Sequence, residues 1–469
     1  MLKKVFSHTA IYGLAPYIPK LFSFFALPII TKDLSATDYG VAGFVTAYVG
    51  AIGVFNTLGL RIILVNSFYH YRSQFKWLWR QLYGFLSLWI LVFAIITTGV
   101  LLFAIPSEAK ANAPTIILLN VIPLVCFGPV SMIGSTYFQL KQKPMQIATR
   151  TILFGLLSVG LNIYMISYLK LGYMGWFWTE CIVGLLSNAS YWYAVNIQLG
   201  LKPIFRFKSS TIIRSLKTAM PTVPHYYATY LLNSSDRMVM DILKIPTNQV
   251  GKYNLAANFG NYFGTLATAS GLATGPMLNS LYKEGKDIVA RNLIFMLQGA
   301  FFLLTFIFCL WSKEIFYLLI RNEVLRQAYP FAIILIMSYN YRPMYFASNA
   351  KILFFEKTSV LWRVSFGAGV INILLNFTLI PVFGVVIASV TTFVAYMYMG
   401  YIGFTFKTFK DLNNGVKHYP LVWLIATVIL TAAAYVLVEL PVMAKASATV
   451  VLLGIAFILY KKFKKHLVN

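Results

Sequence analysis

Residues 82–105 of the chain read LYGFLSLWILVFAIITTGVLLFAI, a run of 24 residues without a charged side chain. A helix rises about 1.5 Å per residue, so the run is long enough to cross about 30 Å of hydrocarbon. Hydrophobic residues make up 59% of the 469 residues and charged residues 11%, whereas a soluble domain carries about 25% charge. The sequence therefore predicts an all-α integral membrane protein with about 14 transmembrane helices.

The other apolar stretches resemble this run in length, and their ends are set to within about two to four residues. The expected spans are 9–31, 39–63, 82–105, 114–138, 150–169, 174–198, 216–242, 250–280, 291–311, 328–350, 359–381, 383–406, 419–438 and 446–460.

The net charge of +26 would suggest nucleic acid binding in a soluble protein. Whether it does so here depends on where the Lys and Arg residues lie along the chain. Lys and Arg are concentrated in alternate loops, with about 27 on one side of the membrane and about nine on the other. By the positive-inside rule, this excess places both termini in the cytoplasm and excludes nucleic acid as a partner. The three cysteines lie far apart inside apolar stretches, so neither a disulfide framework nor a metal site is expected.

No loop is long enough to form a catalytic domain, because the longest have roughly 15 to 18 residues against a minimum of about 50. No phosphate-binding glycine loop, zinc-ligand spacing or catalytic triad is present in the sequence. We therefore expect a transporter without enzymatic activity or a cofactor. The aromatic and basic stretch 67–80 is typical of membrane anchoring at the headgroup level, and a contact with a lipid carrier is the alternative.

An internal repeat divides the chain. A Pro-x-x-Pro-basic motif occurs in the first and the seventh expected spans, and each copy is followed by a short loop and a glycine, at 34–40 and 245–251. Six helices separate the copies, so the two halves have the same orientation in the membrane. We expect two pseudo-symmetric six-helix lobes, 1–200 and 201–412, followed by two extra C-terminal helices in 413–469.

Prolines interrupt helices at corresponding places of the two halves, which is the best indication in a sequence of a transport site. A proline frees backbone carbonyls, and this is tolerated where the helix faces protein or a water-filled cavity. The residues expected to break helices or act as hinges are Pro16, Pro19, Pro221, Pro224 and Pro343.

Few ionisable side chains lie within the expected spans, and each is a functional candidate because burial in lipid costs about 2.5 to 3.5 kcal/mol. Lys20 and Arg342 lie near the midplane, where they could contact an anionic substrate or form a buried salt bridge. Arg61 lies at the inner end of the second span and His225 in the seventh. Arg237 approaches the outer end of the seventh span, where with Asp236 it could instead form an interfacial pair.

Two acidic residues could couple transport to an ion. Glu180 lies in the sixth span and could carry a proton or a cation, or serve only in helix packing. Asp236 is the second candidate. His225 could titrate near neutrality, although a single histidine is more often simply hydrogen-bonded.

Two segments resemble the polysaccharide flippases of the multidrug/oligosaccharidyl-lipid/polysaccharide exporter superfamily. The segment 27–40, LPIITKDLSATDYG, is similar to their opening signature, with a Leu-Pro pair, a basic residue after threonine and an acidic loop ending in Tyr-Gly. Asp236-Arg237 followed by Val250-Gly251-Lys-Tyr253-Asn-Leu-Ala256 is similar to a second signature. With the helix count and loop sizes, the resemblance extends over essentially the whole chain.

The resemblance implies two lobes around a central cavity that opens alternately to either side of a bacterial cytoplasmic membrane. It also implies a flippase that moves undecaprenyl-pyrophosphate-linked oligosaccharide to the outer leaflet without ATP, as O-antigen flippases do, driven by an ion gradient or the membrane potential. Lys20, Arg61, Arg237, Arg342 and His225 would line the cavity. Membrane lipids and other membrane proteins of polysaccharide assembly are further expected partners.

Two alternatives of similar design remain. A peptidoglycan-precursor (lipid II) flippase is barely separable at the level of sequence. A drug or organic-cation antiporter of the same fold should have an acidic or aromatic cavity, which the surplus of cations argues against.

Overall fold

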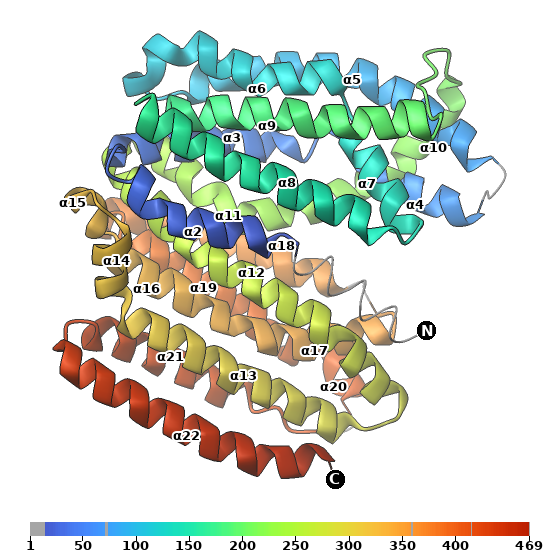
Figure 1. Cartoon of the computed structure of the whole chain (residues 1–469). Helices are drawn as coiled ribbons and strands as arrows, with labels where there is room; N and C mark the ends of the chain where they lie inside the picture. The colour runs from blue at the N-terminus through green and yellow to red at the C-terminus, as the bar shows by residue number, and fades with distance from the viewer. Residues whose placement is uncertain (1–14, 71–73, 358–359, 414, 469) are drawn as a thin grey trace. The chain divides into compact units, whose positions relative to one another are not determined.

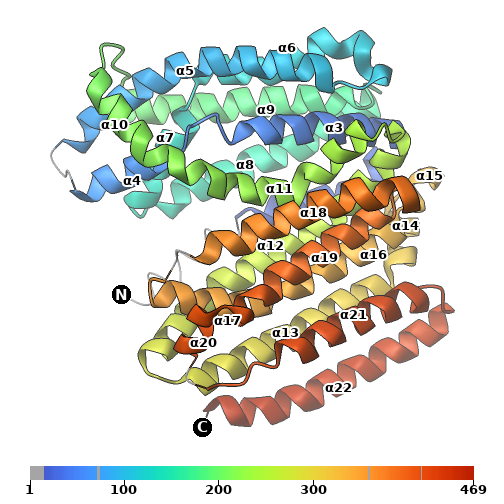
Figure 2. The same cartoon turned by 180° about the vertical axis from the view of Figure 1, so that it is seen from behind.

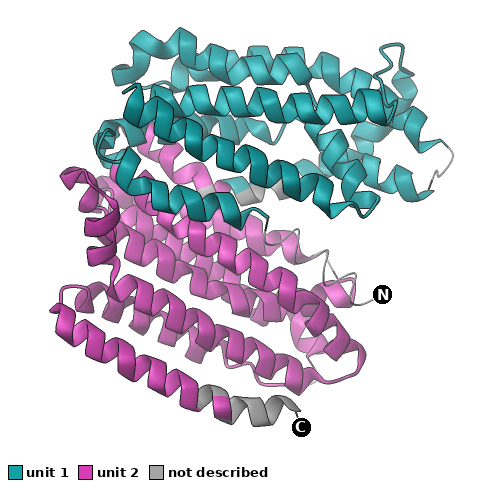
Figure 3. Ribbon diagram, in the orientation of Figure 1, with its two compact units in different colours: residues 1–230, 246–251 teal, residues 231–245, 252–469 magenta. Residues whose placement is uncertain are grey.

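The computed structural model describes residues 15–70, 74–357, 360–413 and 415–468, and within them all regular structure is helical (Figure 1). The chain forms two compact units (Figure 3). Unit 1 comprises residues 1–230 and 246–251, and unit 2 comprises residues 231–245 and 252–469. The domain boundaries expected at 200 and 412 stay predictions.

Unit 1 contains the helices up to the first half of α11. They are α2 (Tyr17–Ile30), α3 (Ala36–Gly53), α4 (Arg61–His70), α5 (Phe75–Ala104), η1 (Ser107–Asn112), α6 (Ala113–Phe127), α7 (Val130–Leu140), α8 (Pro144–Asn162), η2 (Ile163–Tyr168), α9 (Met174–Trp192), η3 (Tyr193–Gln198), α10 (Ser209–Ala219), η4 (Met220–Thr222) and α11 (Val223–Ile242).

Unit 2 continues from the second half of α11. Its further helices are α12 (Thr247–Lys283), α13 (Asp287–Leu310), α14 (Ser312–Leu319), α15 (Glu323–Arg326), α16 (Tyr329–Ser338), η5 (Tyr339–Tyr341), α17 (Arg342–Phe354), α18 (Leu361–Phe383), α19 (Ile387–Tyr401), η7 (Ile402–Thr405), α20 (Lys407–Leu412), α21 (Pro420–Leu437) and α22 (Val442–Val468). The first five residues of α12, 247–251, belong to unit 1.

Within the described residues, each of the fourteen expected spans contains one helix or consecutive helical pieces, and residues 9–14 and 359 of these spans lie outside the described chain. In the described part of the chain, seven helices are long and apolar enough to cross a membrane. They cover residues 75–104, 107–127, 144–168, 287–310, 361–383, 387–405 and 420–437. The predicted all-α membrane architecture is confirmed, while the count of fourteen crossings stays a prediction.

The two units repeat one packing order. In unit 1, α8 packs on α9, α9 on α6, and α6 on α5. In unit 2, α18 packs on α19, α19 on α16, and α16 on α13, and Figure 2 shows α18 and α19 side by side. These helices correspond in chain order, so the same neighbours recur in each half. This recurrence supports the internal repeat that the proline and glycine motifs predict.

The last two helices are fixed to unit 2 through α13, because α21 and α22 both pack along it (Figure 2). Lys445 of α22 is fully buried and pairs with Glu314 of α14 at 2.6 Å. Trp311 donates its indole N–H to Thr449 Oγ1 at 3.0 Å. A buried ammonium needs such a partner, so the ion pair determines where the C-terminal pair of helices docks.

The acidic turn between α2 and α3 has a structural role. Ser35 and Asp38 form a capping box at the start of α3, in which each side chain accepts from the other residue's backbone N–H. The second oxygen of Asp38 accepts the backbone N–H of Tyr173 at 3.0 Å. Asp33 pairs with Lys170. The turn is thereby fastened to the loop that precedes α9.

The repeated glycines Gly40 and Gly251 meet within unit 1, where the first turns of α3 and α12 cross. A Cβ added at Gly40 would lie 2.0 Å from the carbonyl oxygen of Thr247, and one added at Gly251 would lie 1.7 Å from that of Ala36. Thr247 precedes Gly251 by four residues, as Ala36 precedes Gly40. The contact is therefore reciprocal, and only glycine leaves room for it.

Replacing Gly40 with Ala should lower the stability of the protein by about 1 to 3 kcal/mol, because the new methyl group must push two helix backbones apart. The thermal midpoint in detergent, followed by tryptophan fluorescence, measures the loss. Gly53→Ala is the matched control, since nothing lies within 4 Å of a Cβ placed there at the other end of α3. Equal midpoints for both variants would contradict a close crossing.

His418, in the loop before α21, is buried between the rings of Phe404 and Phe409. Burial lowers the pKa of His418 to about 4, and the nearby cations Lys351 and Arg291 add to the effect. Hydrogen bonding to the Val416 carbonyl and the charge of Asp287 oppose it. The imidazole is thus neutral in the folded protein over the physiological pH range.

Because an unfolded histidine titrates near 6.5, the unfolded chain binds a proton that folded His418 does not bind between about pH 6.5 and 4. Stability should be complete above pH 6.5 and decrease on acidification, by about 3 kcal/mol near pH 4. We expect His418→Gln to weaken the fall of the thermal midpoint from pH 7 to pH 5, whereas substitution of the exposed His70 should leave it unchanged. A parallel fall in all three proteins would assign the pH dependence to other groups.

Candidate functional site

The predicted site residues of the described chain lie outside the helices that are both long and apolar enough to span a membrane. Within the described chain, none of them lies on the seven helices that satisfy the length and hydropathy criteria for membrane spans. They lie instead on α2, α4, η4, α9, α11 and α17, or at the residue that caps α2. Among these helices, α2 is itself apolar but has only 14 residues, fewer than a membrane span needs.

A break in the helix precedes Arg342. The helix α16 ends at Ser338, three residues form the 3-10 segment η5, and α17 begins at Arg342 with Pro343 in its first turn. Proline provides no N–H to an upstream carbonyl, so a partner must be found elsewhere. Gln298 of α13 donates its amide to the Asn340 carbonyl at 2.9 Å. The break is thus satisfied by protein groups and holds the Arg342 side chain at a fixed point.

Aromatic rings surround the Arg342 guanidinium. Its carbon lies 5.6 Å from the ring centres of Tyr341 and Tyr345 and 5.5 Å from that of Phe346. Nη1 donates to the Tyr341 hydroxyl at 2.8 Å, and Nη2 lies 3.5 Å from Thr268 Oγ1. Nε is buried without a hydrogen-bond partner, and no ion pair of the described residues includes Arg342. The cation is therefore stabilised by π faces and hydroxyls rather than by a carboxylate.

The rings around Arg342 belong to a larger aromatic cluster. Tyr341 stacks on Tyr396 of α19 with ring centres 4.7 Å apart, and Tyr339 lies 5.4 Å from Tyr396. Tyr339 and Phe346 fit against α12, where a Cβ at Gly264 would lie 2.7 Å from the Tyr339 ring and one at Gly271 would lie 2.4 Å from the Phe346 ring. We call Tyr339, Tyr341, Tyr345, Phe346 and Tyr396, together with Arg342, the arginine–aromatic cluster.

Asp236 of α11 lies at the centre of a buried polar cluster in unit 2. Its carboxylate accepts hydrogen bonds from Tyr253 Oη at 2.5 Å, Asn372 Nδ2 at 2.6 Å, Asn376 Nδ2 at 2.7 Å and Thr392 Oγ1 at 3.2 Å. These donors come from α12, α18 and α19. Asp236 is only 2% exposed, so the interfacial pair considered for it is not formed at a water-exposed helix end. We call this set the Asp236 cluster.

Arg237 follows Asp236 and points to other partners. It is 8% exposed, its Nε donates to Asn254 Oδ1 at 2.8 Å, and its guanidinium carbon lies 5.9 Å from the Tyr253 ring centre. Asp236–Tyr253 and Arg237–Asn254 are thus successive links between α11 and α12. Arg342 contacts the same helix α12 fourteen residues further along, at Thr268. Arg237 and Arg342 therefore both lie against α12 in unit 2.

The remaining predicted residues do not join these clusters. Lys20 is half-buried on α2, one residue after Pro19, whose ring packs against Gly155 of α8. Arg61 is exposed at the start of α4 and donates to Gln139 Oε1 at 2.8 Å. Glu180 lies on the exposed face of α9 and takes part in no ion pair of the described residues. All three belong to unit 1.

The seventh expected span is interrupted where its prolines lie. Pro221 is in the 3-10 segment η4, and Pro224 is in the first turn of α11. Gly59, with a positive φ of 69°, approaches this break, and a Cβ there would lie 2.8 Å from Thr222 Oγ1. Pro16 immediately precedes α2. The side chain of His225 lies outside the described residues.

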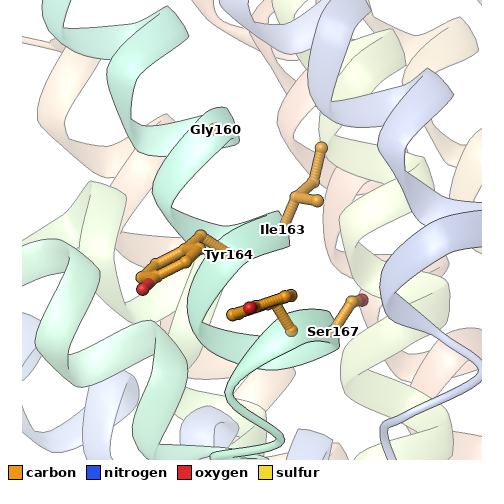
Figure 4. Close-up of a pocket in the computed structure, with 5 residues that line it drawn as sticks. Gly160, Ile163, Tyr164 and Ser167 are labelled. Carbon is orange, nitrogen blue, oxygen red and sulfur yellow. The ribbon is translucent and has the colours of Figure 1, made fainter.

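A shallow groove of about 420 Å³ lies on unit 1 along the end of α8 and η2 (Figure 4). Its lining is Gly160, Ile163, Tyr164, Ser167 and Tyr168. The Tyr164 and Tyr168 rings stack 5.3 Å apart, and Ser167 donates to the Ile29 carbonyl of α2. The groove contains no charged group and none of the predicted site residues, so it offers an apolar surface rather than a site for an anion.

Several residues of the clusters are absent from the sequence-based prediction. Asn372 and Asn376 were missed, although two amides four residues apart in an apolar helix are a recognisable polar face. Tyr253 and Asn254 follow the Val-Gly pair of the second flippase-like segment, but nothing in the sequence shows that they reach Asp236 and Arg237. Only the fold brings α18 and α19 to α11.

Comparison with known proteins agrees with this architecture. The profile of a family described as "Polysaccharide biosynthesis protein" matches residues 2–281. No curated protein sequence matches the chain significantly.

Solved structures share the fold at low sequence identity. A lipid II flippase, MurJ, in an inward closed conformation has 13% identity and a TM-score of 0.65, with 91% of this chain and 97% of that chain covered. A mutant of the MATE transporter VcmN from Vibrio cholerae has 12% identity and a TM-score of 0.59, with 89% and 98% covered. The eukaryotic MATE transporter AtDTX14 has 11% identity and a TM-score of 0.56, with 92% and 98% covered.

Proposed function

Because the chain belongs to the polysaccharide biosynthesis protein family, we propose that it is a flippase for undecaprenyl-pyrophosphate-linked oligosaccharide in a bacterial cytoplasmic membrane. It moves repeat units from the cytoplasmic to the outer leaflet by alternating access, with both termini in the cytoplasm. It requires neither ATP hydrolysis nor a catalytic centre of its own. Proteins that assemble or consume the glycan are further proposed partners.

The observation that carries this proposal is the arginine–aromatic cluster. A pyrophosphate cannot cross hydrocarbon alone, because burying an isolated charge costs many kcal/mol. Arg342 provides a cation whose Nη atoms contact only hydroxyl groups and which has no acidic ion-pair partner among the described residues. A guanidinium binds phosphate oxygens through two parallel hydrogen bonds, so a phosphate can satisfy the donors that the protein leaves available.

Arg237 is the second proposed headgroup contact, because it is a cation that also lies against α12 in unit 2. Lys20 and Arg61 are proposed contacts from unit 1, and His225 from α11. An organic cation would be repelled by these residues, which disfavours the antiporter alternative. A lipid II flippase shares the headgroup chemistry, so only a comparison of substrates separates it.

Arg342→Ala should slow transport by about 10- to 100-fold, the equivalent of one lost hydrogen-bonded ion contact of about 1.5 to 3 kcal/mol. Proteoliposomes containing a fluorescent undecaprenyl-pyrophosphate oligosaccharide report translocation through quenching of the outer leaflet. Arg363→Ala is the matched control, because Arg363 also lies over a ring, that of Trp362, but at the exposed start of α18.

Equal rates for wild type and both variants would remove Arg342 from the pathway. Faster transport of lipid II than of the glycan lipid would favour the peptidoglycan-precursor alternative. Uptake of cationic dyes without glycan-lipid transport would favour the antiporter.

The Asp236 cluster is the proposed site of ion coupling. A buried carboxylate surrounded by hydroxyl and amide groups changes its charge when it binds a proton or a small monovalent cation. Its donors come from three other helices, so a change at Asp236 alters contacts among α11, α12, α18 and α19. The cluster can therefore transmit the occupancy of an ion to helix packing. Glu180 is the other proposed coupling residue.

Asp236→Asn should abolish the dependence of transport on the driving gradient, because the amide cannot change charge. The measurement is the transport rate in proteoliposomes with an imposed sodium gradient or pH gradient, for wild type, Asp236→Asn and Glu180→Gln. Loss of gradient dependence in Glu180→Gln alone would assign coupling to α9 instead. Full gradient dependence in both variants would exclude both residues.

A further inference from the structure

The long helix α12 carries a polar stripe along its middle. Its 37 residues are centred near residue 265, and it is not among the seven apolar helices of the described chain. Asn258, Asn261 and Thr268 are exposed and Thr265 is partly exposed. The spacings of three, four and three residues place all four on one face of the helix. The opposite face is buried through Ala256, Phe259 and Ala267.

The two asparagines of this stripe lack partners. In the described part of the chain, neither the Asn258 nor the Asn261 carboxamide takes part in a hydrogen bond, whereas Thr265 and Thr268 donate to carbonyls of α12 at 2.8 and 2.9 Å. Two unpaired amides facing hydrocarbon would each cost several kcal/mol, which no other feature of α12 offsets. The stripe therefore faces water or a polar ligand.

The stripe leads directly to the arginine–aromatic cluster. Thr268 Oγ1 at one end lies 3.5 Å from Arg342 Nη2. Tyr339 and Phe346 lie along the same helix, in the notches at Gly264 and Gly271. A ligand held by Arg342 through a phosphate would thus have next to it a row of amide and hydroxyl groups bordered by aromatic rings.

This row matches the chemistry of a sugar. A carboxamide both donates and accepts, so it can bind hydroxyl groups in either sense, and a threonine hydroxyl that donates to the backbone still accepts. Apolar ring faces complement the C–H faces of a pyranose. No carboxylate or cation lies on the stripe between residues 258 and 268. An uncharged row of this kind suits neutral, hydroxyl-rich units.

We propose that Asn258 and Asn261, with Thr265 and Thr268, bind the sugar hydroxyls of the transported glycan while Arg342 binds its phosphate. This inference rests on the proposed flippase function and assigns the glycan-recognising part of the same site. A site built to hydrogen-bond hydroxyl groups discriminates strongly against ligands that lack them, because its polar groups are then left unpaired. The stripe is thus the specificity-determining element, and it acts separately from the charge contact.

The test compares two fluorescent probes in proteoliposomes, undecaprenyl pyrophosphate carrying a neutral oligosaccharide and undecaprenyl pyrophosphate without sugar. The double variant Asn258→Leu/Asn261→Leu should move the glycan probe about tenfold more slowly and the sugar-free probe at the wild-type rate. Arg342→Ala should slow both probes. Leu266→Ala, at an exposed apolar position on the same helix, should change neither rate.

Equal slowing of both probes by the double variant would show that the stripe only hydrates the pathway, and wild-type rates for both would show that it does not contact the glycan. Either result overturns the inference while leaving the flippase function intact. A wild-type protein that moves neither probe would overturn the proposed function, and this inference with it. If the double variant Asn258→Leu/Asn261→Leu fails to fold, the smaller double variant Asn258→Ala/Asn261→Ala replaces it. The same results are expected for it, because alanine cannot overpack the site.

Discussion

Hydrocarbon offers no hydrogen bonds, so every polar group in a membrane-spanning helix must find a partner in the protein or face water or a ligand. The break before Arg342 shows the first solution, in which Gln298 of α13 takes up the Asn340 carbonyl. The Asp236 cluster shows it again, with four donors directed at one carboxylate. The carboxamides of Asn258 and Asn261 have no hydrogen-bond partner in the described chain. They must therefore face water or a ligand. Exposed amides without a partner, on a helix in the middle of the chain, are therefore available to water or a ligand.

The same constraint explains how far prediction from the sequence could go. Long apolar runs such as 82–105 cannot be anything but membrane helices, so the fold class followed directly, and the prolines at 221, 224 and 343 indicated interruptions that are 3-10 segments or helix starts. Arg342 stood out because a cation in an apolar span is costly. The partners could not be derived, because periodicity within one helix does not reveal which helices adjoin it. Asn372, Asn376 and Thr392 reach Asp236 only through the packing of α18 and α19.

The crossing at Gly40 and Gly251 shows why the repeated motifs are found where they are. Gly40 makes room for the carbonyl of Thr247, and Gly251 makes room for the carbonyl of Ala36. A Cβ added at either glycine would lie 2.0 or 1.7 Å from that carbonyl oxygen, respectively. Such reciprocity is expected when two copies of one segment meet about an axis, since each surface is then its own complement. The same loops use Ser35 and Asp38 to begin α3 and to fasten it to Tyr173. Motif residues that suggest function by resemblance thus have a structural role in the packing and capping of these helix ends.

Arg342 also bears on the choice among functions. A cation neutralised by a neighbouring carboxylate would already be satisfied, and an anionic ligand would have to displace that partner at a cost of several kcal/mol. Rings and hydroxyls stabilise the guanidinium without cancelling its charge, so the site remains stable when empty and attractive to phosphate. An organic-cation transporter would need the reverse, an acidic group left available within an aromatic surround. In unit 2 the acid Asp236 is enclosed by four donors, whereas the Arg342 guanidinium contacts only rings and hydroxyls, and this difference favours an anionic, sugar-bearing substrate over a cationic drug.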